Sequence, residues 1–259
     1  MDVEPNAILE IDRIGREFGG LVALDDVSCR VHEGQILALI GPNGAGKTTL
    51  LNIVAGALQP TRGHVLFRGR RLQREAPQER VRLGIARTFQ QAHTFANMTV
   101  LENVLVGCHL RGRCGLAEAA LRLPRAAREE EDLYLEAMRF LNLVGLGSHA
   151  HQEAGVLPFG QQRLLAIARA MATAPALLLL DEPAAGLNRL EKNDLAELIQ
   201  RIRQAGITIL LVEHDMELVM RLAEWVVVLD HGRRIAQGTP AQVRRDPAVI
   251  AAYLGMEED

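Results

Sequence analysis

The stretch Gly41–Thr49 (GPNGAGKTT) contains residues whose types and spacing suit the binding of phosphate. It holds the pattern Gly-x4-Gly-Lys-Thr, in which glycines let consecutive backbone N–H groups turn inward around an anion. Lys47 is placed to reach β and γ phosphates, and the Thr48 hydroxyl suits a Mg²⁺ ion. The stretch therefore predicts a site for a nucleoside triphosphate, lined by Gly41, Pro42, Asn43, Gly44, Ala45, Gly46, Lys47, Thr48 and Thr49.

Both flanks of this loop have the composition that a phosphate-binding loop requires. Residues Gln35–Ile40 form an apolar run that suits a buried parallel strand, and Thr49–Ala55 favours a helix, whose N-terminus attracts anions. The alternative interpretation is a chance glycine turn between a strand and a helix, but that turn would explain neither Lys47 nor the hydroxyl after it. The sequence therefore predicts a strand, a phosphate-binding loop and a helix in direct succession.

Ionisable side chains follow two further apolar runs. Asp181 and Glu182 come directly after Leu177–Leu180, and His214 follows another such run. Because ligands of parallel sheets bind at the carboxyl ends of the strands, we expect these side chains at the edge that carries the phosphate loop. There Asp181 would serve Mg²⁺, Glu182 would polarise the attacking water and His214 would donate to the γ-phosphate. Taken singly, each is more often a surface or capping residue, and we expect Asp215 to cap the next helix.

The elements that position these residues follow from the pattern of apolar side chains. Residues 8–40 alternate apolar and polar side chains in short runs, which predicts antiparallel strands, and residues 61–70 add another. From residue 160 onward, apolar strands alternate with helices, which predicts a parallel sheet covered on both faces. Residues 91–158 are helix-rich, and 129–143 have the pattern of an amphipathic helix with an acidic start. The expected fold class is α/β.

The composition limits which classes of protein this chain can belong to. Its 259 residues, 48% of them hydrophobic, are enough for one large domain. A net charge of −3 and an aromatic content of 3% do not suit a nucleic-acid-binding protein, so no such partner is expected. The cysteines Cys29, Cys108 and Cys114 suit free thiols better than a disulfide framework or a metal site. Neither a signal peptide nor a run of ~20 apolar residues is evident, so we expect any membrane role to come through a partner.

The segment Leu157–Arg163 (LPFGQQR) is the most specific feature after the phosphate loop. With the LLAIARAM that follows, it resembles the signature motif of the ATPase subunits of ATP-binding cassette (ABC) transporters, which most other P-loop enzymes lack. The resemblance extends over nearly the whole chain. It implies ATP and Mg²⁺ as ligands and an ABC ATPase fold with an antiparallel β subdomain and a helical subdomain. It also implies a single domain over residues 1–259, with a core of 1–90 and 160–259 and a helical subdomain of about 91–159.

The resemblance assigns roles residue by residue. Phe18 resembles the aromatic residue that stacks on adenine, with an ordinary core residue as the alternative. Gln90 resembles the loop glutamine that contacts Mg²⁺ and the attacking water and links to the membrane subunits. Asp181 and Glu182 match the metal-binding acid and the general base, and His214 matches the switch histidine. The signature residues implied to cap a nucleotide held by another subunit are Leu157, Pro158, Phe159, Gly160 and Gln161.

Within this family, the chain most resembles the ATPases of branched-chain amino-acid importers. The features are AAGLN at Ala184–Asn188, in the place of the dimer-contact loop, LVEHDMELVM around His214, and the ending GTPAQVRRDPAVIAAYLG. The long stretch between Gln90 and Leu157 resembles the larger of the two ATPase subunits in such systems.

This resemblance implies several partners and a location. The partners are a second ATPase subunit, identical or different, transmembrane permease subunits, and a periplasmic or surface solute-binding protein. The implied location is peripheral, at the cytoplasmic face of the inner membrane. ATPases of urea importers and of lipopolysaccharide exporters share much of the pattern and stay open as alternatives. A soluble non-transport ABC ATPase would need a coiled-coil insertion or a second cassette, and the sequence has the pattern of neither.

One position departs from the family's pattern. The signature motif usually carries serine where this chain has Pro158, and in the family that serine donates to the γ-phosphate held by the opposite subunit. Proline has neither a hydroxyl nor an N–H, although it suits the first turn of a helix. The site that uses this motif is therefore expected to rely on the Gly160 backbone and the helix N-terminus.

Overall fold

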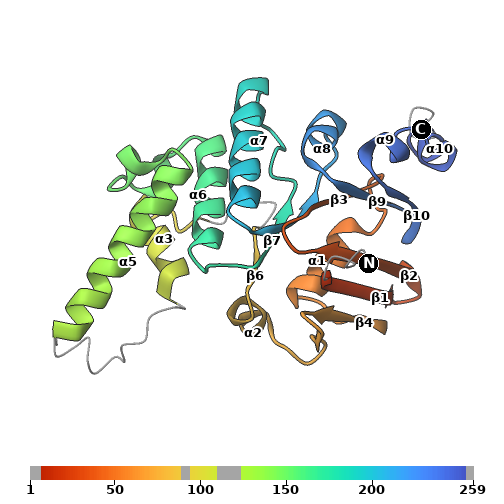
Figure 1. The fold of residues 1–259 in the computed structure, drawn as a ribbon, viewed down its shortest axis with the longest axis horizontal. Coiled ribbons are helices and arrows are strands. Elements are labelled where there is room, and N and C mark those ends of the chain that lie inside the picture. The colour runs from red at the N-terminus through yellow and green to blue at the C-terminus, as the bar shows by residue number, and fades with distance from the viewer. Residues whose placement is uncertain (1–6, 89–93, 110–123, 255–259) are drawn as a thin grey trace, which may run out of the picture. The chain divides into compact units, whose positions relative to one another are not determined.

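The computed structural model describes residues 7–88, 94–109 and 124–254, the last range with the backbone alone at 124–127 and at 254 (Figure 1). By the contacts between its Cα atoms, the chain divides into two compact units. We call residues 1–87 with 176–259 the core unit, and residues 88–175 the helical unit. Each unit is described by itself.

A six-stranded sheet lies at the centre of the described core unit, in the order β10-β9-β3-β8-β7-β6. Its strands are β3 (Ile36–Ile40), β6 (Ile85–Arg87), β7 (Leu177–Asp181), β8 (Thr208–Val212), β9 (Trp225–Asp230) and β10 (Arg233–Gly238). Strand β10 pairs antiparallel with β9, and the other pairs are parallel. Every residue of β3, β7 and β8 is buried, because the sheet is covered on both faces. The predicted parallel sheet is confirmed.

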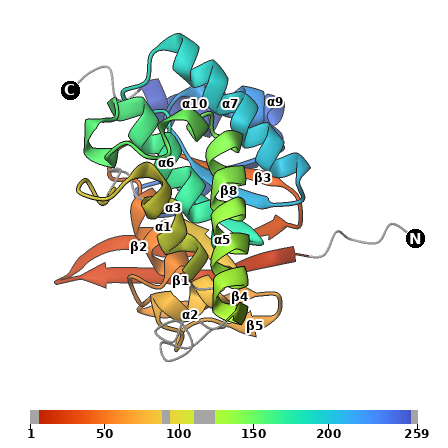
Figure 2. The same ribbon diagram turned by 90° about the vertical axis from the view of Figure 1, so that its left-hand side faces the viewer.

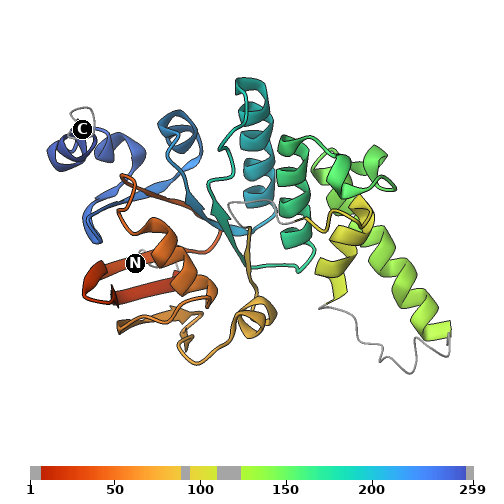
Figure 3. The same ribbon diagram turned by 180° about the vertical axis from the view of Figure 1, so that it is seen from behind.

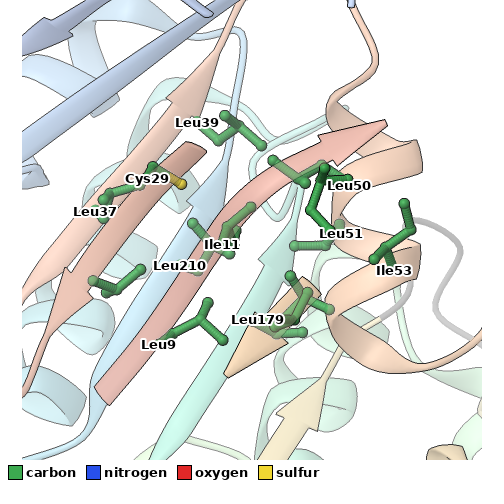
Figure 4. Packing of buried hydrophobic residues seen from close by; sticks show 14 of the residues in the cluster. Leu9, Ile11, Cys29, Leu37, Leu39, Leu50, Leu51, Ile53, Leu179 and Leu210 are labelled. Carbon is green, nitrogen blue, oxygen red and sulfur yellow. The ribbon is translucent and has the colours of Figure 1, made fainter. Parts of the chain in front are cut away.

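A second, antiparallel sheet has the order β2-β1-β4-β5. Its strands are β1 (Ala7–Phe18), β2 (Leu21–His32), β4 (Arg62–Phe67) and β5 (Arg70–Arg71). The long pair of β1 and β2 is seen in Figure 2. This sheet and helix α1 (Lys47–Ala55) share one apolar cluster with the parallel sheet, which contains Leu9 of β1, Leu50 of α1 and Leu39 of β3 (Figure 4).

The opposite face of the parallel sheet is covered by helices of the C-terminal half. These are α7 (Arg189–Gln204), α8 (Met216–Leu222), α9 (Pro240–Val243) and α10 (Pro247–Leu254), on the side away from α1 (Figures 1 and 3). Side chains of β3 alternate between the two faces: Leu37 and Leu39 join the cluster with α1, while Ala38 and Ile40 join the cluster with α8, α9 and α10. Asp215 caps α8 by accepting from the Leu218 N–H at 3.1 Å, as predicted.

The helical unit is built around α3 (Val100–Cys108), α5 (Pro124–Leu143) and α6 (Phe159–Met171), with 3-10 turns at Gly147–His149 and Ala154–Val156. Helix α5 contains the predicted 129–143 and begins five residues earlier. Helices α3 and α6 approach closely, because a Cβ atom at Gly107 would lie 2.3 Å from the Arg169 carbonyl oxygen. By its contacts α6 therefore groups with this unit, although the sequence pattern placed it in the core.

Two further features bear on the expectations from composition. Cys29 and Cys108 are buried, and Cys114 lies outside the described residues. Among the helices of the described ranges, none combines the length and the apolar character needed to cross a membrane.

Candidate functional site

Three neighbouring strands of the parallel sheet end at one edge of the core unit. In the order β3-β8-β7, they lead into the phosphate loop, into Glu213 and His214, and into Asp181 and Glu182. The structure therefore places the loop, the histidine and the acid pair at neighbouring strand ends, where the sequence pattern predicted them.

The phosphate loop has a backbone that requires glycine at its first and last turn. Gly41 and Gly46 have φ values of 147° and 98°, which L side chains rarely adopt. A Cβ atom at Gly41 would lie 2.0 Å from the Leu229 carbonyl oxygen, and one at Gly46 would lie 2.7 Å from the Ala23 carbonyl oxygen. The loop is therefore shaped by its contacts with β9 and β2, and no larger residue fits at either glycine.

Lys47 is a buried cation at the start of α1. Its Nζ donates to the carbonyl oxygens of Gly41 at 2.8 Å and of Pro42 at 2.7 Å. Burial lowers the pKa of Lys47, and the carboxylates of Glu182 and Asp181 act in the opposite direction. The ammonium group thus lies across the loop and close to the acid pair, where the negative charge of a triphosphate would be balanced.

Asp181 is almost fully buried, with its two oxygens in different situations. Oδ2 accepts from Arg87 Nη2 at 2.8 Å, and Arg87 Nη1 donates to the Asn52 side-chain oxygen at 2.5 Å. Oδ1 is buried and has no hydrogen-bond partner within the part of the chain that the structure describes. A buried carboxylate oxygen without a donor fits the outer shell of a hydrated Mg²⁺ ion, with the Thr48 hydroxyl as the direct ligand.

Glu182 occupies an unusual backbone position. Its φ is 45°, in the left-handed region that a non-glycine residue adopts only at a cost, and its N–H donates to the Val212 carbonyl oxygen at 2.9 Å. The bond ties the end of β7 to the end of β8. Such strain concentrates at functional sites, which suits the role predicted for this carboxylate.

The His214 ring is largely exposed, with 59% of its side-chain surface accessible. Its Nδ1 lies 3.9 Å from Oε2 of Glu213, which is fully buried. The backbone N–H of His214 donates to the Glu213 carboxylate at 3.0 Å, while the ring is exposed. The ring is therefore suited to contact a ligand that binds at this edge of the sheet. Sequence reasoning gave no role to Glu213 or to Arg87, although each lies at the end of a buried strand.

Of the other two predicted site residues, Phe18 is described by the structure and Gln90 is not. Phe18 ends β1 with 43% of its surface exposed, which excludes the alternative of a core residue, and the Arg16 guanidinium lies 4.5 Å from the centre of its ring. An exposed aromatic ring suits stacking on a base. Gln90 lies outside the described residues.

The signature residues lie in the helical unit at the start of α6. Leu157 is buried and Phe159 is exposed, with the Arg163 guanidinium 4.7 Å from its ring centre. Pro158 lies at the start of α6, just before its first turn. Pro158 is the N-cap, because its ψ of 152° is extended, and its carbonyl accepts the first helical hydrogen bond, from Gln162 N at 3.0 Å. Gly160 and Gln161 then form the first turn.

Comparison with protein families and with individual proteins gives a consistent result. The family model described as "ABC transporter" matches residues 24–185, and that described as "Branched-chain amino acid ATP-binding cassette transporter" matches residues 233–258. The chain is 44% identical to the high-affinity branched-chain amino acid transport ATP-binding protein LivG of Salmonella typhimurium, over 96% of this chain and 98% of that protein. It is 43% identical to the corresponding protein BraF of Pseudomonas aeruginosa, over the same shares of the two chains.

Solved structures agree with this. A crystal structure of the ADP conformation of an ABC transporter cassette has a TM-score of 0.84 and 33% identity, covering 96% of this chain and 99% of the other. A nucleotide-free cassette from an ABC transporter has a TM-score of 0.83 with the same identity and coverage.

Proposed function

The chain belongs to the ABC transporter family, and on that premise we propose that it is the ATP-hydrolysing subunit of an importer for branched-chain amino acids. ATP hydrolysis is supported by one observation: the phosphate loop, the acid pair and His214 follow neighbouring strands and lie at one edge of the sheet. The solute is supported by the similarity to LivG and BraF and by the match at residues 233–258.

The residues at this edge divide the chemistry among them. The phosphate loop and Lys47 bind the β and γ phosphates through N–H groups and the buried ammonium. Thr48 and Asp181 would hold Mg²⁺, with Gln90 as a further ligand, and the ion when bound neutralises charge on the phosphates. Glu182 accepts a proton from the attacking water, and His214 donates a hydrogen bond to the γ-phosphate.

The phosphate loop of one chain forms only half of a complete site. Phe18 stacks on the adenine, while the signature residues Leu157–Gln161 of a second ATPase subunit cover the phosphates. ATP bound between two subunits favours their closed arrangement, and hydrolysis removes that preference. Such a cycle moves the permease subunits, which contact the ATPase near Gln90.

The proposed assembly contains a second ATPase subunit, permease subunits and a solute-binding protein, with this chain on the cytoplasmic face of the membrane. The test is reconstitution of the co-purified complex in liposomes, with ATP hydrolysis measured as leucine, valine, urea or no solute is supplied with the binding protein. We expect leucine and valine to stimulate the rate. Stimulation by urea alone, or co-purification with lipopolysaccharide and no response to any solute, would contradict the proposed substrate.

A further inference from the structure

Glu213 is a charged side chain that the chemistry above does not use. It follows the last residue of β8, and none of its surface is accessible. Because an ionised carboxylate is costly to bury without partners, a fully buried glutamate needs donors close by.

These donors are three backbone N–H groups from two different loops. Oε1 accepts from Ala184 N at 2.8 Å, in the loop that follows β7. Oε2 accepts from His214 N at 3.0 Å and from Asp215 N at 3.3 Å, in its own loop. One carboxylate therefore joins the loop after the acid pair to the loop that carries the histidine, through charge-assisted hydrogen bonds.

The two loops are those that hold the groups proposed for hydrolysis. The backbone around Glu182 is fixed by two hydrogen bonds. The N–H of Glu182 donates to the Val212 carbonyl oxygen, and the N–H of Ala184, two residues later, donates to the Glu213 carboxylate. These bonds hold Glu182 in its left-handed conformation at φ 45°, which a non-glycine residue does not keep without such support. On its other side, Glu213 fixes the first two amides of the turn that presents His214.

We propose that Glu213 is a positioning residue that sets the general base and the histidine relative to each other for ATP hydrolysis. The inference rests on the roles proposed above for Glu182 and His214. Because Glu213 is fully buried, it acts through the two loops and not by direct contact with the nucleotide. The phosphate loop depends on other contacts, with β9 and β2, so Glu213 controls the rate of hydrolysis and not the affinity for ATP.

The test is Glu213→Gln in the full chain co-purified with its permease subunits. Glutamine has the same size but only one acceptor oxygen. Its side-chain NH₂ group would face a backbone N–H of one of the two loops, donor against donor, so glutamine cannot join the two loops. Since a misplacement of about 1 Å can cost about 100-fold in rate, we expect kcat to fall about 10- to 100-fold and the KM for ATP to change less than about twofold. Asp215→Asn is the matched control: it removes a charge from the same loop, keeps the cap of α8, and is expected to keep kcat.

A double-variant measurement separates positioning from a general loss of structure. In a His214→Ala background, part of what Glu213 positions is already gone, so Glu213→Gln should lower kcat less than it does alone. An unchanged kcat in Glu213→Gln, a rise in KM equal to the fall in kcat, or the same fold-loss in both backgrounds would overturn the proposal. If Glu213→Gln does not fold, Glu213→Asp is measured instead. It keeps the charge but is too short to reach Ala184, and a kcat like that of the unaltered chain would overturn the proposal as well.

Two controls distinguish a failure of this inference from a failure of the proposed function. Glu182→Gln and His214→Ala are expected to lower kcat by themselves. If both retain the original rate, the roles assigned to them are wrong. If both lose activity while Glu213→Gln retains it, the function stands and only the positioning role is wrong.

Discussion

Replacement of Arg80 by methionine is predicted to destabilise the helix that begins at the phosphate loop. Arg80, in the short helix α2 (Pro77–Arg82), is 1% exposed. Its guanidinium donates to the carbonyl oxygens of Ile53, Val54, Leu72 and Glu75. The first two belong to the last turn of α1, where the Ile53 carbonyl oxygen also accepts from the N–H of the C-cap Gly56 at 3.2 Å. Arg80 thus caps α1 from a distant part of the chain, and its charge suits the negative end of the helix dipole.

The magnitude follows from these four bonds. A hydrogen bond to a charged group contributes about 1.5–3 kcal/mol, and neighbouring bonds from one side chain are not additive. Methionine replaces the apolar stem but leaves buried carbonyl oxygens without their charged donor. We therefore expect a loss of about 3–5 kcal/mol in the free energy of unfolding. For a chain of this size each kcal/mol lowers Tm by about 2–4 °C, so Tm should fall by about 10 °C.

The assay is thermal and urea denaturation followed by circular dichroism, with Arg82→Met as the control. Arg82 is a neighbour on the same helix, but it is exposed and forms an ion pair with Glu79, three residues earlier. Exposed ion pairs contribute little, so Arg82→Met should change the unfolding free energy by less than about 0.5 kcal/mol. Equal effects of the two substitutions would refute the reasoning that the cap of α1 depends on Arg80.

Three further predictions concern the phosphate loop, acid stability and the signature motif. Gly41→Ala should prevent folding of the loop, since its Cβ atom would lie 2.0 Å from a carbonyl oxygen of β9. Gly44→Ala has open space around its Cβ atom and should lower Tm by only a few degrees. Equal Tm values for the two variants would contradict this prediction. The hydrogen bond from Lys192 holds the pKa of Asp215 below its ordinary 3.8, so this pair stabilises the fold above that pH and the stabilisation is lost as pH falls through the lowered pKa. Urea denaturation between pH 5 and 2 should therefore show a steeper loss in the unaltered chain than in Asp215→Asn, and parallel curves would count against the pair. Pro158→Ser should raise the ATPase rate of the assembled complex by supplying a hydroxyl toward the γ-phosphate, and an unchanged rate would show that the site does not need that donor.

The sequence was sufficient for the parts of the site whose chemistry is local. The phosphate loop, the acid pair and His214 each follow a buried apolar strand, and the rule that ligands bind at the carboxyl ends of parallel strands brings them together. Asp215 was predicted as a cap because capping depends on the next three residues alone.

What the sequence could not predict depends on contacts between distant residues. Arg80 stands in a short basic stretch and gives no sign that it reaches Ile53, 27 residues earlier. Glu213 resembles any acid after a strand until the loop containing Ala184 is placed beside it. Strand β10 was missed because its sequence, RRIAQG, is polar. Its place in the sheet comes from antiparallel pairing with β9, a contact that the pattern of apolar residues does not show. The sequence also did not predict that Pro158 is the N-cap of α6, because proline is compatible with the first turn as well.

The central claim is that Glu182 is the base for ATP hydrolysis at a site formed by the phosphate loop. The most direct measurement is the Glu182→Gln variant of the assembled complex, with ATP affinity and single-turnover hydrolysis determined on the same preparation. The account predicts that ATP binds with a Kd within a few-fold of that of the unaltered chain, because Lys47 and the loop glycines are intact, while hydrolysis falls by at least about 100-fold. Hydrolysis at the original rate would contradict the account.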